Sequence, residues 1–123
     1  MHKILLIEDE QALADLLVMM LKVKYQVFHV AEGNLAFHAA KEFKPDLIIL
    51  DVMLPGMDGY TVQNQFFADE TLKDIPIIIS SSKTNTEELF GPSPNVACFI
   101  AKPFSLETMS KKIDELLNRN KGS

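Results

Sequence analysis

The chain has 123 residues, of which 47% are apolar and 24% are charged, and its formal net charge is −5. This is the length of one ordinary domain with a single core, and the composition is typical of a globular protein rather than a disordered chain. No apolar run approaches the roughly twenty residues of a membrane helix, and the acidic balance argues against direct binding to nucleic acid, whose phosphates select basic surfaces.

The first half of the chain alternates short apolar runs with segments of helical spacing. The run Ile4–Ile7 has strand length, and apolar residues three and four positions apart predict a helix from Leu13 to Met20. The mixed run Gln26–Val30 predicts an edge strand. The segment Ala36–Phe43 predicts a second helix, and the continuous apolar run Leu47–Leu50 suits a strand covered on both faces.

The second half repeats this pattern with one interruption. A helix is predicted over Tyr60–Phe67 and a strand over Ile77–Ile79. The next helix could begin near Asn85, but it meets the segment Gly91–Pro94, where two prolines remove donors and bias the residues before them away from helical angles. We therefore expect a fourth helix that is short, over about 85–90, or that is replaced by a loop.

A strand and a helix close the chain. The run Val96–Ile100 predicts the fifth strand, and helical spacing from Leu106 to Leu117 predicts the last helix, with Ser105 as its N-cap. The elements therefore form five β-α units. Strict alternation of this kind predicts a single α/β domain, a doubly wound (βα)5 fold with a five-stranded parallel sheet and helices on both faces.

Polar side chains gather where the predicted strands end. Ligands bind at the carboxyl ends of the strands in open α/β sheets, so these residues are candidates for one common site. Singly, an acid after a strand is often only the first residue of a helix, and a serine cluster is often a turn. These ordinary explanations are weaker for a charged residue at the end of an apolar strand, because burying a charge costs free energy. The candidates are Glu8, Asp9 and Glu10 after the first strand, Asp51 after the third, Ser80–Ser82 after the fourth and Lys102 after the fifth.

These residue types favour transfer of a phosphoryl group onto an aspartate. Clustered carboxylates repel one another, so such a site either raises a pKa or recruits a cation. Oxygen ligands without histidine or cysteine favour Mg²⁺. Asp51 as the nucleophile, a metal ion and Lys102 as a partner for phosphate oxygens are the components that this reaction needs. A nucleotide is not the expected donor, because the sequence has no glycine-rich phosphate-binding loop.

Three motifs carry a resemblance to a known family. They are Asp51–Gly59 (Asp-Val-Met-Leu-Pro-Gly-Met-Asp-Gly), Glu8–Asp9 and Lys102–Phe104. In this order and at this spacing they resemble the phospho-acceptor loop, the acidic pair and the lysine-proline motif of the response-regulator receiver domains of two-component signalling. The resemblance extends over essentially the whole chain, and it implies a flavodoxin-like sheet with strand order 2-1-3-4-5.

The resemblance also implies a role for each residue of the site. Asp51 is the implied phospho-acceptor and a ligand of Mg²⁺. Asp9 and the backbone carbonyl of Met53 are further direct ligands, and Glu8 acts on the ion through water. Lys102 is the implied cationic partner of the phosphoryl group.

Two further positions correspond to the family's conformational switch. The switch hydroxyl lies five residues after Pro76, which gives Ser81, although a serine on either side leaves an ambiguity of one residue. The switch aromatic lies three residues before the lysine, which gives Phe99, and a plain core aromatic is the alternative. In this family the peptide bond that corresponds to Lys102–Pro103 is typically cis.

A signalling role rather than a classical enzyme follows from the resemblance, since the domain would catalyse only its own phosphorylation and dephosphorylation. The implied partner is a sensor histidine kinase or a phosphotransfer protein, with an unknown output partner, and we expect a monomer when unphosphorylated. We expect a receiver domain over 1–120, a tail over 121–123 and a cytoplasmic location without a secretory signal. Cys98 is expected to be a buried, inert thiol, and the histidines His2, His29 and His38 to be structural.

Two alternatives stay open at this stage. The first is a small phosphatase or phosphotransferase that uses Asp51 on an outside substrate, although Met53 stands where a second acid is expected and no cap region is present. The second is a pseudo-receiver, an interaction module that phosphorylation does not regulate. The interrupted fourth helix favours this second alternative, and an acid-stable, hydroxylamine-labile phosphoryl group on Asp51 would exclude it.

Overall fold

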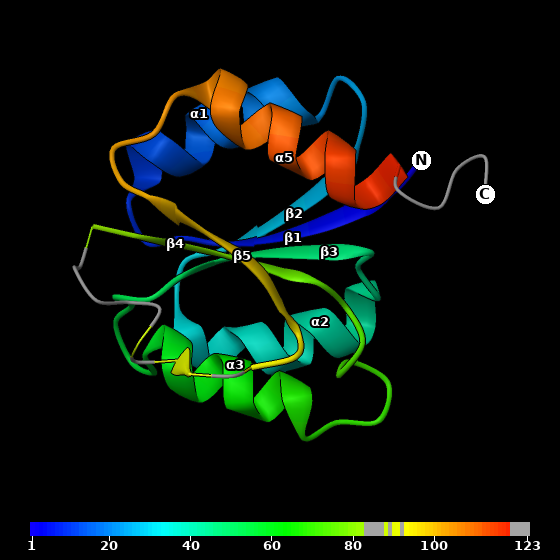
Figure 1. Cartoon of the computed structure of the whole chain (residues 1–123), viewed down its shortest axis with the longest axis vertical. Coiled ribbons are helices and arrows are strands. Elements are labelled where there is room, and N and C mark those ends of the chain that lie inside the picture. Colours follow the sequence, from blue (N-terminus) through cyan, green and yellow to red (C-terminus); the bar gives the residue numbers. More distant parts are fainter. Residues whose placement is uncertain (83–87, 89, 92, 119–123) are drawn as a thin grey trace.

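The computed structural model describes residues 1–82, 88, 90, 91 and 93–118. Five parallel strands form one sheet in the order β2-β1-β3-β4-β5, as the sequence and the resemblance predicted. Helices α1 and α5 cover one face of this sheet, and α2 and α3 cover the other (Figure 1). The strands are β1 (Lys3–Ile7), β2 (Gln26–Val30), β3 (Leu47–Asp51), β4 (Ile77–Ser81) and β5 (Val96–Ala101).

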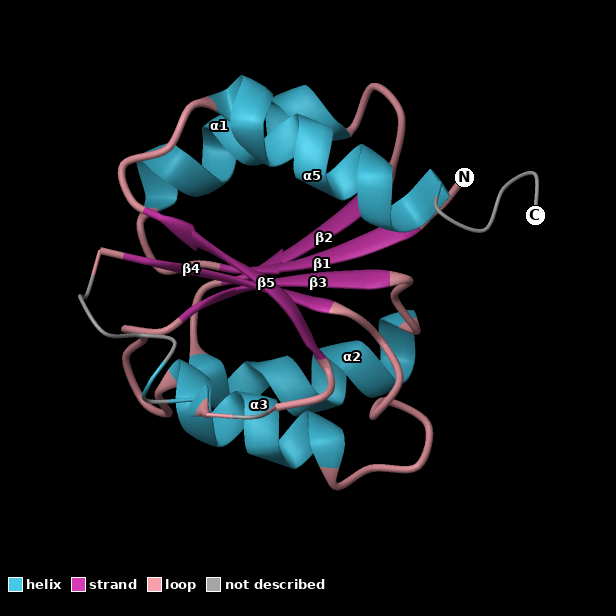
Figure 2. Ribbon diagram, viewed as in Figure 1, coloured by secondary structure: helices cyan, strands magenta, loops and turns pink. Residues whose placement is uncertain are grey.

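Figure 2 shows the helices, and local backbone angles or capping hydrogen bonds account for one end each of α2, α3 and α5. They are α1 (Gln11–Leu21), the 3-10 helix η1 (Gly33–Leu35), α2 (Ala36–Phe43), α3 (Gly59–Phe67) and α5 (Leu106–Asn118). Helix α2 ends at Lys44, which adopts left-handed backbone angles with φ 55°. The Asp58 carboxylate accepts a hydrogen bond from the Thr61 amide at 2.9 Å and caps α3. The Ser105 hydroxyl accepts one from the Thr108 amide at 3.0 Å, which confirms the predicted N-cap.

The three central strands owe their continuous apolar sequence to burial on both faces. Alternate residues of β1 point to opposite sides: Leu5 packs with α2 and α3, and Leu6 packs with α1 and α5. Every residue of β3 and β4 is buried, whereas the edge strands β2 and β5 are only partly covered. The carboxyl ends of β1, β3 and β4 therefore rest on a tightly packed support.

Several smaller predictions can be compared with the structure at this point. The Lys102–Pro103 peptide bond is cis, as the resemblance implied. Cys98 is half-buried rather than buried, because it lies in the edge strand β5, and this partial burial raises the pKa of its thiol. The fourth helix predicted over 85–90 lies almost entirely outside the described residues, as does the tail predicted over 121–123. Among the described residues, no helix combines the length and the apolar character that a membrane crossing requires.

Candidate functional site

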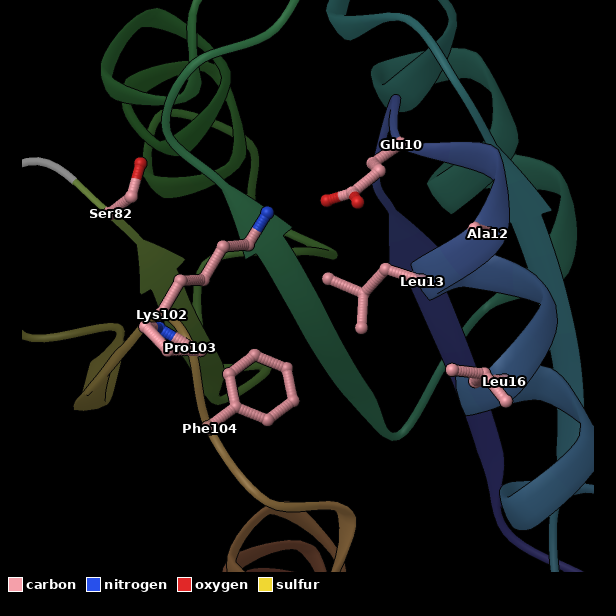
Figure 3. Close-up of a pocket in the computed structure, with 8 residues that line it drawn as sticks. All are labelled: Glu10, Ala12, Leu13, Leu16, Ser82, Lys102, Pro103 and Phe104. Carbon is pink, nitrogen blue, oxygen red and sulfur yellow. The ribbon is translucent and has the colours of Figure 1, made fainter.

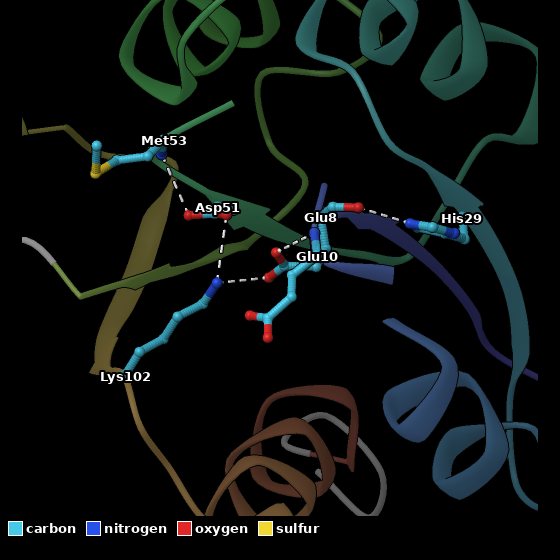
Figure 4. A network of polar contacts seen from close by, with 6 residues as sticks. All are labelled: Glu8, Glu10, His29, Asp51, Met53 and Lys102. Carbon is cyan, nitrogen blue, oxygen red and sulfur yellow. Dashed lines mark hydrogen bonds and ion pairs between the residues drawn. The ribbon is translucent and has the colours of Figure 1, made fainter. Parts of the chain in front are cut away.

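The carboxyl ends of β1, β3 and β5 bring four of the candidate residues together. Carboxylate oxygens of Glu8, Asp9 and Asp51 all lie within 4.8 Å of one another. The Lys102 ammonium lies 2.8 Å from Glu8 Oε1 and 3.3 Å from Asp51 Oδ2, so one cation contacts two of the three acids (Figure 4). These residues are up to 94 positions apart in the sequence, and only the parallel sheet makes them neighbours.

Burial distinguishes the three acids. Glu8 is 2% exposed and Asp51 is 5% exposed, whereas Asp9 is open to solvent. Backbone donors hold the two buried carboxylates in place. The Met53 amide donates to Asp51 Oδ1 at 3.2 Å, and the Glu10 amide donates to Glu8 Oε2 at 3.0 Å. Each buried carboxylate thus has one oxygen bound to the backbone and the other bound to Lys102.

The charges of the site are strongly coupled. Burial, and after it the negative charge of Glu8, raise the pKa of Asp51 from 3.8 to about 7, against the opposing effect of Lys102. Burial by itself would lower the pKa of the Lys102 ammonium. The hydrogen bond to Glu8 and the charges of both carboxylates outweigh burial, so the pKa of Lys102 is raised. The site therefore holds its lysine charged and resists ionisation of its central aspartate.

This donor set fits a small divalent cation. Its three carboxylates face a single ammonium within the described residues of the cluster, which leaves a negative excess when all are ionised. The ligand atoms are all oxygens, which Mg²⁺ prefers. Asp51, Asp9 and Glu8 are the side chains that could hold the ion.

The loop after β3 is shaped by close backbone approaches. A Cβ atom on Gly59 would lie 2.6 Å from the Asp51 carbonyl oxygen, so only glycine lets α3 begin this close to the end of β3. On its other side the loop packs on η1. A Cβ atom on Gly33 would lie 1.8 Å from the Met57 carbonyl oxygen, and the Gly33 amide donates to the Pro55 carbonyl at 3.4 Å.

Of the two predicted switch positions, Ser81 lies beside Lys102 of this cluster. Ser81 is the last residue of β4 and is buried, and its carbonyl accepts a hydrogen bond from the Lys102 amide at 2.9 Å. Its neighbour Ser80 pairs with Asp51 in the sheet, and among the described residues the Ser80 hydroxyl has no hydrogen-bond partner. Both serines are therefore close to the end of β3, and the assignment of Ser81 as the switch stays a prediction.

Phe99 is half-buried and belongs to an aromatic series. Its ring lies 5.9 Å from that of Phe90, which lies 5.5 Å from that of Tyr60 at the start of α3. The rings meet edge to face, which is a favourable arrangement. Phe99 packs at the margin of the core, as both the switch and the core-aromatic interpretations allow.

A pocket opens beside the acidic cluster, between the start of α1 and the segment after β5 (Figure 3). Lys102 reaches across one side of it, and Leu13, Leu16 and Phe104 supply apolar walls. Leu16 is 49% exposed, so this wall is accessible from solvent. The acidic cluster is therefore bordered by an apolar surface that solvent can reach.

One contact of the site escaped the sequence analysis. The sequence predicts only a structural role for His29, and its Nε2 lies 2.7 Å from the backbone carbonyl oxygen of Glu8 (Figure 4). The two residues are 21 positions apart, and β2 brings them together because His29 pairs with Leu6 of β1. The sequence offered one signal for this contact, which is a polar residue near the carboxyl end of the strand that lies beside β1.

A sequence model of the family described as response regulator receiver domain matches residues 4–114. The DNA-binding dual master transcriptional regulator RpaA of Synechocystis sp. is 33% identical over 121 residues, which cover 97% of this chain and 50% of RpaA. The chain thus spans about half the length of the first curated relatives it matches, the DNA-binding response regulator MtrA of mycobacteria among them.

Two solved structures show the same architecture with a modified or metal-bound site. The phosphorylated cyanobacterial phytochrome response regulator RcpA is 32% identical, with a TM-score of 0.78 over 93% of this chain and 91% of that one. The receiver domain of the sensor histidine kinase PA1611 from Pseudomonas aeruginosa PAO1 has a magnesium ion coordinated in its active site cleft. It is 26% identical, with a TM-score of 0.82 over 95% of this chain and 98% of that one.

Proposed function

The chain belongs to the response regulator receiver domain family of two-component systems, and we propose that it accepts a phosphoryl group on Asp51 and changes conformation in response. The observation that carries this proposal is the setting of Asp51. Its carboxylate ends a central strand, is 5% exposed, and lies among two further carboxylates and an ammonium. Burying the carboxylates of Glu8 and Asp51 beside each other costs free energy, and arrangements of this kind are concentrated at functional sites.

The proposed donor is the phosphohistidine of a sensor histidine kinase or of a phosphotransfer protein. A carboxylate oxygen of Asp51 forms the new bond to phosphorus while the bond from phosphorus to the histidine nitrogen breaks. The nitrogen keeps the electron pair and takes up a proton. Because the Met53 amide holds Oδ1 at 3.2 Å, the carboxylate is already oriented before the donor arrives.

The other residues of the site neutralise and bind the incoming group. Asp51, Asp9, the Met53 carbonyl and (through water) Glu8 would hold Mg²⁺, which when bound would supply positive charge beside the phosphoryl oxygens. Lys102, which contacts Asp51 Oδ2 at 3.3 Å, is placed to donate to one of these oxygens. Its contact with Glu8 at 2.8 Å keeps the ammonium inside the site.

Phosphorylation then supplies the signal. It adds about 1.5 to 2 negative charges and three acceptor oxygens. We propose that the hydroxyl of Ser81 and the ammonium of Lys102 bind these oxygens, which favours an inward position of the end of β4. Phe99, on the neighbouring strand, would adjust with it, and one of two pre-existing conformations would gain population.

The readout of this signal is a separate part of the proposal. RpaA is described as DNA-binding, and this chain matches about half of RpaA. We propose that the receiver itself does not contact DNA, because its net charge is −5, and that it is a monomer before phosphorylation. A dimer that persists at all concentrations in sedimentation would contradict the second statement.

Phosphorylation with acetyl phosphate tests the central proposal. With Mg²⁺, intact-mass measurements should show one added phosphoryl group that hydroxylamine removes, and NMR resonances of Asp51, Ser81 and Phe99 should shift. Asp51→Asn and chelation of the metal should both abolish these changes. An unmodified wild type that still binds a protein partner would support the pseudo-receiver alternative, and Asp51-dependent turnover of a phosphomonoester would support the enzyme alternative.

A further inference from the structure

A histidine on the far side of the acidic loop contacts the backbone of the site. His29 lies in β2, and its Nε2 is 2.7 Å from the carbonyl oxygen of Glu8. Because a carbonyl can only accept, the imidazole must donate from Nε2. The neutral ring with its proton on Nε2 and the charged ring both meet this condition, so the contact does not depend on the ionisation of His29.

This contact completes a clamp on the first residue after β1. The Glu8 amide donates to the Val30 carbonyl at 3.1 Å, which continues the ladder between β1 and β2 by one residue. At the next peptide group the backbone ladder stops, and the side chain of His29 takes the place of a backbone donor. Glu8 is thus held through both its amide and its carbonyl, each by a residue of β2.

The clamped carbonyl belongs to the peptide group that joins Glu8 to Asp9. Holding the plane of this peptide constrains the backbone from which Asp9 extends, and Asp9 itself is exposed. Holding this plane also constrains the backbone from which Glu8 reaches Lys102. Figure 4 shows His29 beyond Glu8, on the side away from Asp51 and Lys102, so the ring does not contact the reacting atoms.

We propose that His29 is a positioning residue, which holds the Glu8–Asp9 peptide and thereby raises the affinity of the acidic cluster for a divalent cation. The inference deepens the proposed function and rests on it. Groups that orient the ligands of a metal commonly change its affinity without contacting it. Here His29 binds the backbone between Glu8 and Asp9, two of the proposed ligands, so one hydrogen bond affects the position of both acids.

The test compares two substitutions of the full chain. His29→Leu removes the donor at similar volume, and His29→Gln restores a donor. The first readout is the amide resonance of Asp9 in chelated, metal-free protein, since this amide and the Glu8 carbonyl form one peptide group. The second is the dissociation constant for Mg²⁺ alone, measured by titration. Urea unfolding of each variant separates loss of the site from loss of the fold.

We expect the Asp9 amide to shift in His29→Leu and the Mg²⁺ dissociation constant to rise about tenfold, at the low end for groups that act through a ligand. His29→Gln should return both readouts close to wild type. His38→Leu is the matched control, because the side chain of His38 is 82% exposed on α2 and its Nε2 lies 3.8 Å from Oε1 of Glu42, outside the site. It should bind Mg²⁺ like the wild type.

Wild-type Mg²⁺ affinity in His29→Leu, or equal weakening in His29→Leu and His29→Gln, would overturn the inference. If leucine prevents folding, His29→Met replaces it in the same comparison. The result is independent of phosphorylation. A wild type that binds Mg²⁺ but accepts no phosphoryl group defeats the proposed function alone, whereas a phosphorylated wild type with an unaffected His29→Leu variant defeats this inference alone.

Discussion

Asp51 should make the stability of the metal-free protein depend on pH. Its pKa is about 7 in the folded chain, compared with an ordinary value of 3.8, first because of burial and then because of the charge of Glu8. Between these values the folded state binds more protons than the unfolded state. The contribution of Asp51 to the free energy of unfolding should therefore be highest below about pH 4, fall as the pH rises through this window, and level off above about 7.

The size of the effect follows from the shift. A tenfold change in an equilibrium constant corresponds to about 1.4 kcal/mol, so raising the pKa of Asp51 from 3.8 to about 7 corresponds to an upper limit of about 4 kcal/mol lost between pH 4 and 8. This is a large part of the 5 to 15 kcal/mol or so that stabilises an ordinary domain. Asp51→Asn has nearly the same shape, keeps an oxygen for the Met53 amide, and cannot ionise. The variant should lack this part of the slope and should be more stable than the wild type at pH 8.

Urea unfolding followed by circular dichroism, with a chelator present, measures both proteins across the window. The unfolding free energy of Asp51→Asn minus that of the wild type should increase with pH, and it can change sign, because only the wild type loses the contribution of Asp51. Most other groups titrate alike in the two proteins. Adding Mg²⁺ at about ten times its dissociation constant should stabilise the wild type at pH 8 by about 1.4 kcal/mol. The variant should gain much less. A difference that stays constant from pH 4 to 8 would refute the account of buried charge given above.

Three further substitutions test other parts of the structure. Tyr25→Phe removes the hydrogen bond that the phenol donates to the Asp114 carboxylate, and it should lower the unfolding free energy in urea by about 1 kcal/mol while phosphoryl acceptance stays unchanged. Gly33→Ala places a Cβ atom 1.8 Å from the Met57 carbonyl oxygen, so the acceptor loop must move. Labelling by acetyl phosphate should slow, and an unchanged rate would show that this packing does not matter. Phe66→Ala empties a fully buried site and should cost about 3–5 kcal/mol in urea unfolding.

The sequence by itself determined the class of fold, and it predicted the candidate residues Glu8, Asp9, Asp51 and Lys102 that the structure brings together. Continuous apolar runs such as Leu47–Leu50 predicted buried parallel strands, because only strands covered on both faces exclude polar residues from every position. The segment Asp51–Gly59 predicted the family through its resemblance to a known loop motif, and a match over residues 4–114 confirmed the family. Short-range patterns carry this kind of information because the residues involved are neighbours in the chain.

The tertiary structure decided what depends on which strands lie side by side. The half-burial of Cys98 reflects the place of β5 at the edge of the sheet, which local spacing did not predict. The contact of Lys102 with both Glu8 and Asp51 requires the carboxyl ends of β1, β3 and β5 to meet at one rim. The bond from His29 to Glu8 requires the register of β2 against β1. Periodicity within a segment reports whether its residues are buried, but the identity of the neighbouring segment is a property of the assembled sheet.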